Sequence, residues 1–374
     1  MRILYLCNYY HRAMIFRDSM NYLEKRGHEV MAFNSVIKNS SVDEKYLAIM
    51  DDKVIHKECF TRFDRYYYFG KQEKILKALL SSIDVDEFDV LHSHTLFNGG
   101  WVARRIYKKT GIPYIVSVRN TDMNDYLRIP IFKVIAKIII NDAKHIQFLS
   151  EAYREAFIQK CFPNNPEVIY AKSSVITNGL EPFWIEHIVN EPKKMQQNQI
   201  HLLCVGKIDK NKNMKGVLEA MKILDQRGYQ VKTQIVGQVL DSEIASMIQG
   251  YENTEVLDYM TKEELIYKYQ ESDIYVMPSF TESFGRVYAE AMTQGLPIIF
   301  TRGQGFDGQF QEGYVGYSVN PTNYSEIADR IEEICNNYTE ISSNCLKECH
   351  RFDWNQIAIS LEDMYQKVVN LGEK

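Results

Sequence analysis

Short apolar runs alternate with stretches of helical pattern along almost the whole chain. In the opening part, residues 2–7 and 28–33 are expected to form buried strands, with a helix from about 15 to 26 between them. A strand, a helix and a second strand in this order form the βαβ unit of a parallel sheet. The alternation restarts at residues 200–205, after a polar and non-periodic stretch at 187–199. The sequence therefore predicts an α/β protein with two doubly wound domains.

The bulk composition narrows the class of protein. With 374 residues the chain exceeds what one hydrophobic core usually serves. A net charge of -5 argues against general affinity for nucleic acid. The first residues do not resemble a signal peptide, and no apolar run approaches the ~20 residues that span a bilayer. The seven cysteines are scattered, which suits a reducing compartment better than a disulfide framework. We therefore expect a cytoplasmic protein.

One strand–turn–helix segment carries most of the chemical information. The apolar residues 274–277 predict a short buried strand, and Glu282 lies in the turn that follows it. A helix is expected to begin near Phe284 and to end before Gly295, and it contains Glu290. The segment therefore presents two carboxylates beyond the end of one strand.

If the helix extends back to Glu282, the spacing of these carboxylates excludes one kind of chemistry. Eight residues of helix rise about 12 Å, whereas the two carboxyl groups of a retaining glycosidase lie about 5–5.5 Å apart. Glu282 and Glu290 are therefore expected to bind separate hydroxyl clusters of one long ligand. The helix amides of Ser283, Phe284 and Gly285 lie between them and would form an anion site. The alternative is a surface helix with two solvated glutamates.

A second segment places positive charge beyond another strand. Gly206 and Lys207 follow the strand at 200–205, and Lys212 and Asn213 precede the next helix. Lysines between a strand and a helix suit a diphosphate ligand, because ligands of open α/β sheets bind beyond the carboxyl ends of the strands. The alternative is a basic surface loop.

Polar side chains follow the strands of the first domain as well. His11 and Arg12 lie in the first loop, where they are expected either to reach a ligand or to be solvated. The other polar residues beyond strand ends are His92, His94, Arg119, Asn120, Thr121 and Asp122. By the same rule we expect this set to face a ligand.

Metal chelation is not expected. Asp84 and Asp86 match the D-x-D pattern of metal-dependent glycosyltransferases, but they precede a strand instead of following one and are expected to form a solvated turn. Cys345, Cys349 and His350 supply too few ligands for a structural zinc ion, so we expect them to pack in the core.

The pattern Glu282-Ser-Phe-Gly-x4-Glu290-Ala-Met-x2-Gly-Leu-Pro resembles the E-x7-E motif of the retaining glycosyltransferases of family 4, in particular those that build bacterial surface glycans. Residues 89–94, 111–118 and 176–179 are similar to first-domain signatures of the same family. The resemblance implies the GT-B fold, in which two Rossmann-like domains face a cleft and the C-terminal helix crosses back to the first domain.

The resemblance also implies domain limits and residue roles. It places an acceptor-binding domain at 1–190, completed by the helix at 355–374, and a nucleotide-sugar-binding domain at 191–354. The expected catalytic residues are Glu282, Lys207, Lys212 and Arg119. The expected donor-binding residues are Gly206, Lys207, Lys212, Asn213, Glu282, Ser283, Phe284, Gly285 and Glu290. The expected acceptor-side residues are His11, Arg12, His94, Asn120 and Asp122.

Three departures from the family pattern affect these roles. Lys207 stands where the family usually has arginine, which keeps the charge but loses the bidentate fork. Arg119 stands where many members have histidine, so the role of that histidine cannot be transferred. The first loop also lacks the glycines that approach the diphosphate in many relatives.

The implied reaction is transfer of a hexosyl or N-acetylhexosaminyl group, with retention of configuration, to a glycan or lipid-linked glycan acceptor in surface polysaccharide synthesis. A UDP-sugar is the donor that the family uses most often, and no cofactor or metal is expected because the lysines can stabilise the leaving diphosphate. The alternatives are a nucleotide-sugar epimerase of the same fold and a non-catalytic protein that binds a sugar or nucleotide.

Two segments suggest contact with an anionic membrane surface. Residues 129–140 are strongly apolar and carry Lys133 and Lys137, and a second basic helix carries Lys71, Lys74 and Lys77. Basic faces beside exposed apolar residues bind anionic membranes without spanning them. The alternative is that both helices pack inside the first domain. A cytoplasmic enzyme at the inner face of the cell membrane is the expectation.

Overall fold

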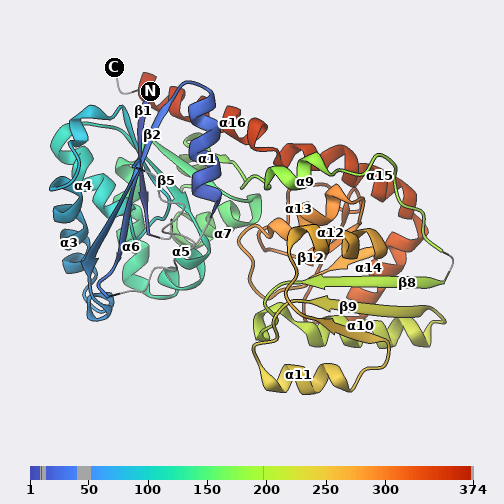
Figure 1. Cartoon of the computed structure of the whole chain (residues 1–374). Coiled ribbons are helices and arrows are strands. Elements are labelled where there is room, and N and C mark those ends of the chain that lie inside the picture. The colour runs from blue at the N-terminus through green and yellow to red at the C-terminus, as the bar shows by residue number, and fades with distance from the viewer. Residues whose placement is uncertain (9, 11–13, 40–51, 197, 372–374) are drawn as a thin grey trace. The chain divides into compact units, whose positions relative to one another are not determined.

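The chain forms two compact units. The computed structural model describes residues 1–371 except 9, 11–13, 40–51 and 197 (Figure 1). The first unit comprises Met1–Leu149, Arg154–Gly179 and Trp354–Lys374, and the second comprises Ser150–Tyr153 and Leu180–Asp353. Each unit contains one parallel sheet with helices packed on it, as the alternation of strands and helices predicts.

The first unit is built on a seven-stranded sheet in the order β3-β2-β1-β4-β5-β6-β7. Its strands are β1 (Arg2–Cys7), β2 (Glu29–Ile37), β3 (Val54–Phe60), β4 (Val90–Ser93), β5 (Tyr114–Val118), β6 (His145–Phe148) and β7 (Ser173–Val175). Every pairing is parallel. Side chains of β4 and β5 are buried on both faces, which is typical of a parallel sheet covered on both sides.

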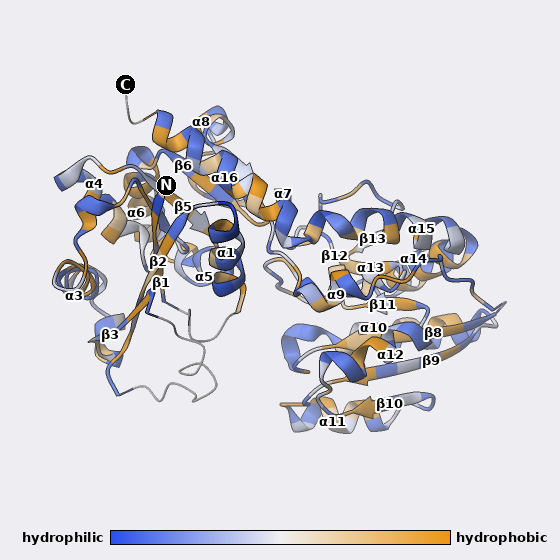
Figure 2. Cartoon of the chain, turned by 45° about the horizontal axis from the view of Figure 1, so that its top comes forward, coloured by the Kyte–Doolittle hydropathy of each residue, from blue (hydrophilic) through white to orange (hydrophobic). Residues whose placement is uncertain are grey.

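The helices of this unit are α1 (Met14–Lys25), α3 (Tyr68–Leu80), α4 (Gly100–Thr110), α5 (Asn120–Asn124), α6 (Pro130–Asp142), α7 (Glu151–Cys161), α8 (Pro166–Ala171) and α16 (Trp354–Asn370). Short 3₁₀ turns are η2 (Arg62–Arg65), η3 (Val85–Glu87) and η4 (Tyr126–Arg128). In Figure 2 the helices carry both hydrophilic and hydrophobic residues. This amphipathic pattern lets each helix bury one face against the sheet.

The C-terminal helix belongs to the first unit, as predicted. Leu361 and Met364 of α16 share one apolar core with residues of α1 and β1, and Figure 1 shows α16 beside α1. Tyr365 lies inside this core, where its hydroxyl is hydrogen-bonded to His92 Nδ1 at 2.6 Å and donates to Tyr5. These contacts join the last helix to β1 and β4 at the centre of the sheet.

The second unit repeats the same strand arrangement in a six-stranded sheet, β10-β9-β8-β11-β12-β13. Its strands are β8 (Gln199–Val205), β9 (Gln230–Val236), β10 (Thr254–Leu257), β11 (Ile274–Val276), β12 (Ile298–Thr301) and β13 (Gly316–Val319). Its helices are α9 (Pro182–Glu186), α10 (Met214–Gln226), α11 (Ser242–Gln249), α12 (Lys262–Glu271), α13 (Arg286–Thr293), α14 (Tyr324–Asn336) and α15 (Tyr338–Glu348), with short turns η5 (Lys210–Lys212) and η6 (Cys349–Phe352). The two halves are therefore both Rossmann-like, as expected.

The segment before β8 packs onto the second unit. Trp184 of α9 is buried, with its ring 5.5 Å from that of Tyr269. Lys193 donates from Nζ to the carbonyl oxygens of Tyr269 and Gln270 at the end of α12. The chain thus passes into the second unit at Leu180, whereas the sequence placed that boundary after residue 190 and indicated a linker at 187–199.

Several sequence expectations concern other surfaces. Asp84 and Asp86 form an exposed turn in which the Asp86 amide donates to the Asp84 carboxylate, so the predicted turn is confirmed. No helix in the described part of the chain is long and apolar enough to cross a bilayer. Residues 40–51, and with them part of the stretch before β3, lie outside the description.

The expectation that α3 exposes Lys71, Lys74 and Lys77 holds for Lys74 and Lys77 but is wrong for Lys71. Lys71 is buried, and its ammonium group donates to Asn98 Oδ1 at 2.7 Å. Lys74 pairs with Asp64 at 2.7 Å, which leaves Lys77 as the exposed lysine of the three without a described ion-pair partner. The helix period places Lys71 on the side of α3 that packs on the unit, so α3 offers little free positive charge.

Candidate active site

Two loops meet at the carboxyl edge of the second sheet. One loop, residues 206–213, follows β8, and the other, residues 277–285, follows β11. Because β8 and β11 are neighbours in the parallel sheet, the loops that leave their carboxyl ends lie side by side. This edge holds most of the donor-binding residues that the sequence predicted.

Asn211 joins the two loops. Its side-chain oxygen accepts from the amide and the hydroxyl of Thr281 at 2.9 and 2.7 Å, and its Nδ2 donates to the Thr281 carbonyl at 2.9 Å. The Phe280 amide donates to the backbone oxygen of Asn211 at 2.8 Å. Both the oxygen and the nitrogen of the Asn211 side-chain amide thus bond to the second loop. Asn211 fixes where Glu282, one residue after Thr281, is presented.

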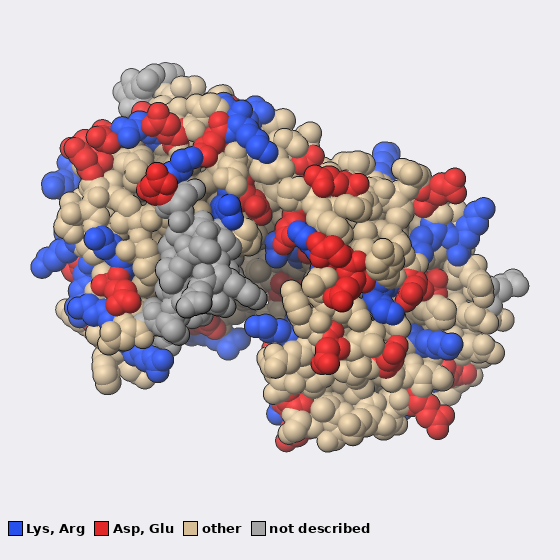
Figure 3. Space-filling view, viewed as in Figure 1, with Lys and Arg blue, Asp and Glu red and all other residues tan. Residues whose placement is uncertain are grey.

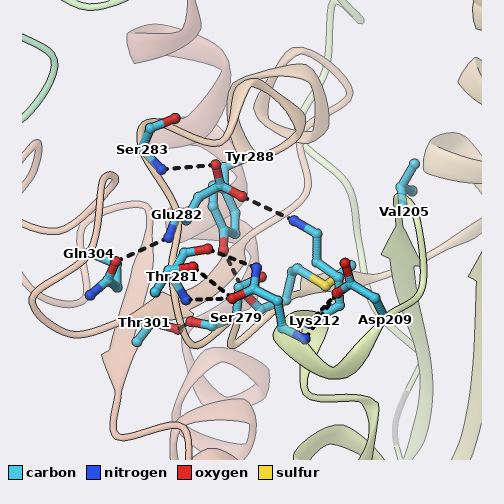
Figure 4. A network of polar contacts seen from close by, with 12 residues as sticks. Val205, Asp209, Lys212, Ser279, Thr281, Glu282, Ser283, Tyr288, Thr301 and Gln304 are labelled. Atoms are coloured by element: carbon cyan, nitrogen blue, oxygen red, sulfur yellow. Dashed lines mark hydrogen bonds and ion pairs between the residues drawn. The ribbon is translucent and has the colours of Figure 1, made fainter. Parts of the chain in front are cut away.

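Lys212 and Glu282 form the ion pair at the centre of this edge. The Lys212 ammonium nitrogen lies 3.0 Å from Glu282 Oε2, and Figure 4 shows the two side chains pointing toward one another. The side chains are only 17% and 18% exposed, so water screens the pair less than it screens a surface pair. The pair presents one cation and one hydrogen-bond acceptor at a single point of the loop junction.

The backbone of Glu282 is held on both sides by the loop after β12. Its amide donates to Gln304 Oε1 at 3.0 Å (Figure 4). Its carbonyl accepts from the Gly305 amide at 2.8 Å. A Cβ atom on Gly305 would lie 2.2 Å from the Ser283 carbonyl carbon, so only glycine permits this approach. The loop after β12 therefore supports Glu282.

Helix α13 begins later than predicted. It starts at Arg286, after Gly285 in the left-handed conformation with φ 76°, whereas the sequence placed the start near Phe284. Of the amides that were expected to bind an anion, that of Ser283 donates to Glu282 Oε1 at 3.0 Å. Phe284 itself is buried and packs its ring 5.9 Å from that of Phe306. Glu282 thus lies in a loop whose shape is fixed by side-chain and backbone hydrogen bonds.

Glu290 lies on α13 with a partner of its own. The Tyr269 hydroxyl donates to Glu290 Oε2 at 3.5 Å. Burial raises the pKa of Glu290 from 4.5 to about 7, and the positive charge of Arg286 opposes the shift. Near neutral pH the carboxyl group therefore exchanges between an ionised acceptor and a protonated donor. Glu282 and Glu290 therefore have different partners, Lys212 for Glu282 and Tyr269 for Glu290.

The loop after β8 owes its shape to glycines and a left-handed asparagine. Gly206 and Gly237 approach so closely that a Cβ on Gly237 would lie 2.1 Å from the Gly206 carbonyl oxygen. Asn213 has φ 52°; its side chain donates to the carbonyls of Pro278 and Pro321 and accepts from the Gly216 amide. Asn213 is therefore held inside the protein and positions the loop.

Lys207 and Lys212 differ in their surroundings. Lys207 is exposed, and no ion pair is described for it among the residues that the structure covers. The Lys212 side chain runs past Gly206, where a Cβ would come 3.6 Å from Lys212 Cε. The side chain of Lys212 thus passes close to the backbone of Gly206, whereas the side chain of Lys207 is exposed to solvent.

In the first unit the structure brings His94, Arg119 and Asn178 together. Arg119 donates from Nη1 to Asn178 Oδ1 at 3.1 Å and from Nε to the His94 carbonyl at 3.3 Å. Burial lowers the pKa of Arg119 to about 10, so the guanidinium stays charged at neutral pH. His94 stacks on His92 with ring centroids 4.1 Å apart, and burial lowers its pKa well below 6.5, so it is neutral there.

The other predicted acceptor-side residues have structural contacts. Asp122 is fully buried and accepts from the amides of Leu96, Phe97 and Arg119 at 3.0, 3.1 and 2.9 Å. Burial raises its pKa to about 6, against the lowering effect of those three amides. Asn120 accepts from Asn124 Nδ2 at 2.6 Å. His11 and Arg12 lie outside the described residues.

Three residues of these sites were not found from the sequence. Asn211 and Gln304 hold the loop of Glu282, and Asn178 binds Arg119. Asn211 lies in the lysine-containing loop after residue 205, and Asn178 lies in the segment 176–179, both of which stand out in the sequence. Nothing in the sequence indicated which residues these two asparagines would contact. In the described ranges no three His, Cys, Asp or Glu side chains are grouped as metal ligands.

Two family models match the chain, one for each unit. Residues 15–180 match the model described as Glycosyltransferase Family 4, and residues 188–355 match Glycosyl transferases group 1. Together the two matches cover most of the chain, and their junction falls close to the passage between the two units.

Known proteins resemble the chain over different lengths. An uncharacterised 41.2 kDa protein in the cps region of Klebsiella pneumoniae is 24% identical over 92% of this chain and 96% of its own length. The capsular polysaccharide biosynthesis glycosyltransferase CapM of Staphylococcus aureus is 27% identical over 53% of this chain and 55% of its own. The structure of Anabaena Alr3699/HepE in complex with UDP covers 98% of this chain and 100% of its own, with 17% identity and a TM-score of 0.72.

Proposed function

Because the chain is a glycosyltransferase of the GT-B type, we propose that it transfers a sugar, with retention of configuration, from a UDP-sugar to a glycan or lipid-linked glycan acceptor. The observation that carries the proposal is the Lys212–Glu282 pair at the carboxyl edge of the second sheet. A cation and an acceptor held 3.0 Å apart can bind a phosphate oxygen and a sugar hydroxyl that are neighbours in one ligand.

In the proposed reaction, Lys212 stabilises the diphosphate as it leaves. The bond between the anomeric carbon and the diphosphate oxygen breaks, and the acceptor hydroxyl oxygen bonds to the same carbon from the same face. The acceptor proton passes to the leaving phosphate oxygen. Preorganised positive charge where negative charge develops usually lowers the barrier of such a reaction more than any other single effect. Lys207, which is exposed, adds a second cation near the start of the same loop.

The two glutamates orient the donor. Glu282 accepts hydrogen bonds from sugar hydroxyls, and its loop is fixed by Asn211 and Gln304. Glu290 binds the ribose hydroxyls, where its Tyr269 contact and raised pKa permit both donation and acceptance. We propose that no metal ion is required, because the two lysines of the loop supply the positive charge that the leaving group needs.

Acceptor binding is assigned to the first unit. Its charged Arg119 and the neighbouring His94 and Asn178 suit an acceptor with hydroxyl or anionic groups. The capsular relative supports a surface polysaccharide as the product, and the UDP complex of HepE supports a uridine donor. We propose that the enzyme works in the cytoplasm at the inner face of the membrane, where lipid-linked acceptors are found.

Thermal shift measurements test the donor proposal. A ligand that binds only the folded state raises the melting temperature by mass action. UDP is expected to raise it more than GDP or ADP does, and Lys212→Ala is expected to lose most of the shift. Lys232→Ala, which changes an exposed lysine of β9, is the matched control. No shift with any of the three nucleotides would contradict a nucleotide-sugar site.

Acceptor-free incubation separates the proposal from its alternatives. A glycosyltransferase is expected to release UDP slowly from a UDP-sugar by transfer to water. A nucleotide-sugar epimerase would convert the donor to its epimer without releasing UDP, and a binding protein would leave the donor unchanged. Product analysis by chromatography and mass spectrometry distinguishes the three outcomes.

A further inference from the structure

An exposed group of aromatic side chains follows β3 in the first unit. Phe63 in η2, Tyr66 and Tyr67 in the turn after it, and Phe69 in the first turn of α3 are 83%, 92%, 68% and 43% exposed. Isolated exposed apolar residues are ordinary, but four large rings in one short segment indicate a contact surface. We refer to these four side chains as the aromatic group.

The Tyr67 ring lies on the backbone of Gly70. A Cβ atom on Gly70 would come 2.2 Å from Tyr67 Cδ1 and 2.4 Å from Tyr67 Cε1, so the ring occupies the space that any other side chain would take. Gly70 lies in α3, where alanine would favour the helix more than glycine does. The ring is therefore held on one side and exposed on the other, which preorganises it for stacking on a ligand.

The aromatic group lies at the carboxyl edge of the first sheet. Its segment begins after the end of β3 at Phe60, whereas His94 follows the end of β4 and Arg119 follows the end of β5. All the strands of this sheet are parallel, so the three loops leave the same edge. The aromatic group therefore belongs to the edge that carries the residues assigned to acceptor binding.

Hydrogen bonds join the aromatic segment to the neighbouring loops of this edge. The Tyr68 hydroxyl donates to the Phe97 carbonyl at 2.9 Å, and Lys71 Nζ donates to Asn98 Oδ1 at 2.7 Å. The Phe97 amide in turn donates to Asp122 Oδ1 at 3.1 Å. The segments after β3, β4 and β5 are therefore held together, and the aromatic group has a fixed place beside the acceptor residues.

The sheet order sets a distance between the aromatic group and the acceptor residues. Strands β2 and β1 separate β3 from β4. Three strand spacings amount to about 14 Å, which is longer than one sugar ring. An acceptor whose reacting end lies at His94 and Arg119 therefore reaches the aromatic group only with sugars further along its chain.

The chemistry of the segment suits sugar rings better than charged partners. Lys71 is buried and Lys74 is paired with Asp64, so these lysines are not free to bind an anion. Basic and acidic side chains are intermingled over the face of the molecule that Figure 3 shows. A pyranose presents C–H bonds on its faces and hydroxyls around its rim. Its face can pack on an aromatic ring while a tyrosine hydroxyl exchanges hydrogen bonds with the rim.

We propose that Phe63, Tyr66, Tyr67 and Phe69 form an acceptor subsite that stacks on sugars of a glycan chain at a distance from its reacting end. The subsite rests on the proposed function, because it presupposes a glycan acceptor at the first unit. It makes the length of the acceptor chain, in addition to its terminal sugar, a determinant of binding.

Binding of size-fractionated oligosaccharides to the full chain tests the subsite. The probe is the surface polysaccharide of the source organism, cleaved by mild acid and separated into single sugars and fragments longer than about 14 Å. Calorimetry is expected to show that wild type binds the long fragments more tightly than the single sugars. Tyr66→Ala with Tyr67→Ala should weaken binding of the long fragments by about 10-fold, since each ring contact contributes about threefold.

Two further variants separate the rings from the fold. Tyr66→Phe with Tyr67→Phe keeps both rings and should bind the long fragments within about twofold of wild type. Gly70→Ala removes no aromatic atom but puts a Cβ where the Tyr67 ring lies. It should weaken binding by about threefold, as Tyr67→Ala does. Its melting temperature should not fall, because alanine favours a helix more than glycine.

A matched control removes two exposed tyrosines elsewhere. Tyr170→Ala with Tyr267→Ala changes rings of α8 and α12 and should bind the fragments like wild type. The proposal is overturned if wild type binds the long fragments no more tightly than the single sugars, or if the control loses binding as the Tyr66 and Tyr67 variant does. A wild-type dimer, or wild-type binding to neutral vesicles, that Tyr66→Ala with Tyr67→Ala abolishes would also overturn it.

Acceptor-free release of UDP from a UDP-sugar distinguishes this proposal from the proposed function. That reaction needs the donor site alone, so every variant of the aromatic group should keep the wild-type rate. Wild type that releases UDP but binds no fragment would overturn the subsite and leave the transfer reaction in place. Wild type that releases no UDP would count against the proposed function itself.

Discussion

The side-chain oxygen of Asn211 accepts two hydrogen bonds from Thr281, one from its amide and one from its hydroxyl. This asparagine lies in the loop that carries Lys212, and the threonine immediately precedes Glu282. The distance between Lys212 and Glu282 therefore does not depend on two flexible side chains alone. It follows from a backbone junction that Asn211 builds between two neighbouring strands.

Loss of the Asn211 junction should impair catalysis more than folding. Asn211→Ala removes the side-chain hydrogen bonds to Thr281, and we expect kcat to fall by about 10-fold because Glu282 and Lys212 are no longer held in one geometry. Asn336→Ala, at an exposed position near the end of α14, should leave kcat unchanged. Steady-state kinetics with saturating donor give the comparison. An effect on the donor KM alone would contradict a positioning role in the reaction.

The Lys212–Glu282 pair should be indispensable for transfer. Lys212→Ala is expected to lower kcat by on the order of 100-fold or more, because it removes charge where the leaving diphosphate develops it. Glu282→Gln keeps the shape but weakens acceptance from sugar hydroxyls, and a comparable loss is expected. Circular dichroism should show an intact fold for both. Near-normal turnover in both variants would remove the pair from the active site.

Glu290 should make stability depend on pH. Its pKa is raised from 4.5 in the unfolded chain to about 7 in the fold, so the folded state binds more protons between these values. The free energy of unfolding therefore falls as pH rises through this window, by up to about 3 kcal/mol from this group. Wild type should lose stability relative to Glu290→Gln between pH 4.5 and pH 8, as measured by urea denaturation. A pH-independent difference between the two proteins would refute the assignment.

The contact between Gly206 and Gly237 should not tolerate a side chain. Gly237 has φ 135°, and a Cβ there would lie 2.1 Å from the Gly206 carbonyl oxygen. We expect Gly237→Ala to destabilise the protein by about 2 kcal/mol or more, since the loop after β8 must move. Gly228→Ala is the control: it also has positive φ, 92°, but meets nothing within 4 Å, and should cost about 1 kcal/mol. Equal midpoints in urea for both variants would contradict the close approach.

Removal of metal ions should leave the transfer reaction intact. The proposed reaction uses the ammonium groups of Lys207 and Lys212 to stabilise the leaving diphosphate, so turnover should persist in EDTA. The measurement is UDP release with and without EDTA, followed by addition of magnesium or manganese. Activity that EDTA abolishes and either metal restores would show that the lysines do not suffice.

The sequence by itself determined much of this protein. The period-2 and period-3.6 patterns predicted two parallel sheets covered by helices, because strands buried on both faces must be apolar throughout. The same patterns placed Glu282 and Lys212 beyond strand ends, and parallel strands bring those ends to one edge of a sheet. The family resemblance of the sequence also implied that the last helix returns to the first unit, which α16 does.

Only the tertiary structure decided which polar groups meet. Asn211 bonds to a residue 70 positions later, and no local pattern specifies a partner at such a distance. Lys71 looked exposed in the sequence, yet Asn98 gives its ammonium group a buried partner. Asp122 and Asn213 looked like ligand contacts, but their side chains are held by backbone groups of their own unit. Local periodicity fixes which face of an element is buried. Hydrogen-bond partners depend instead on how elements far apart in the sequence pack together. This packing therefore decides which charged side chains remain free to bind a ligand.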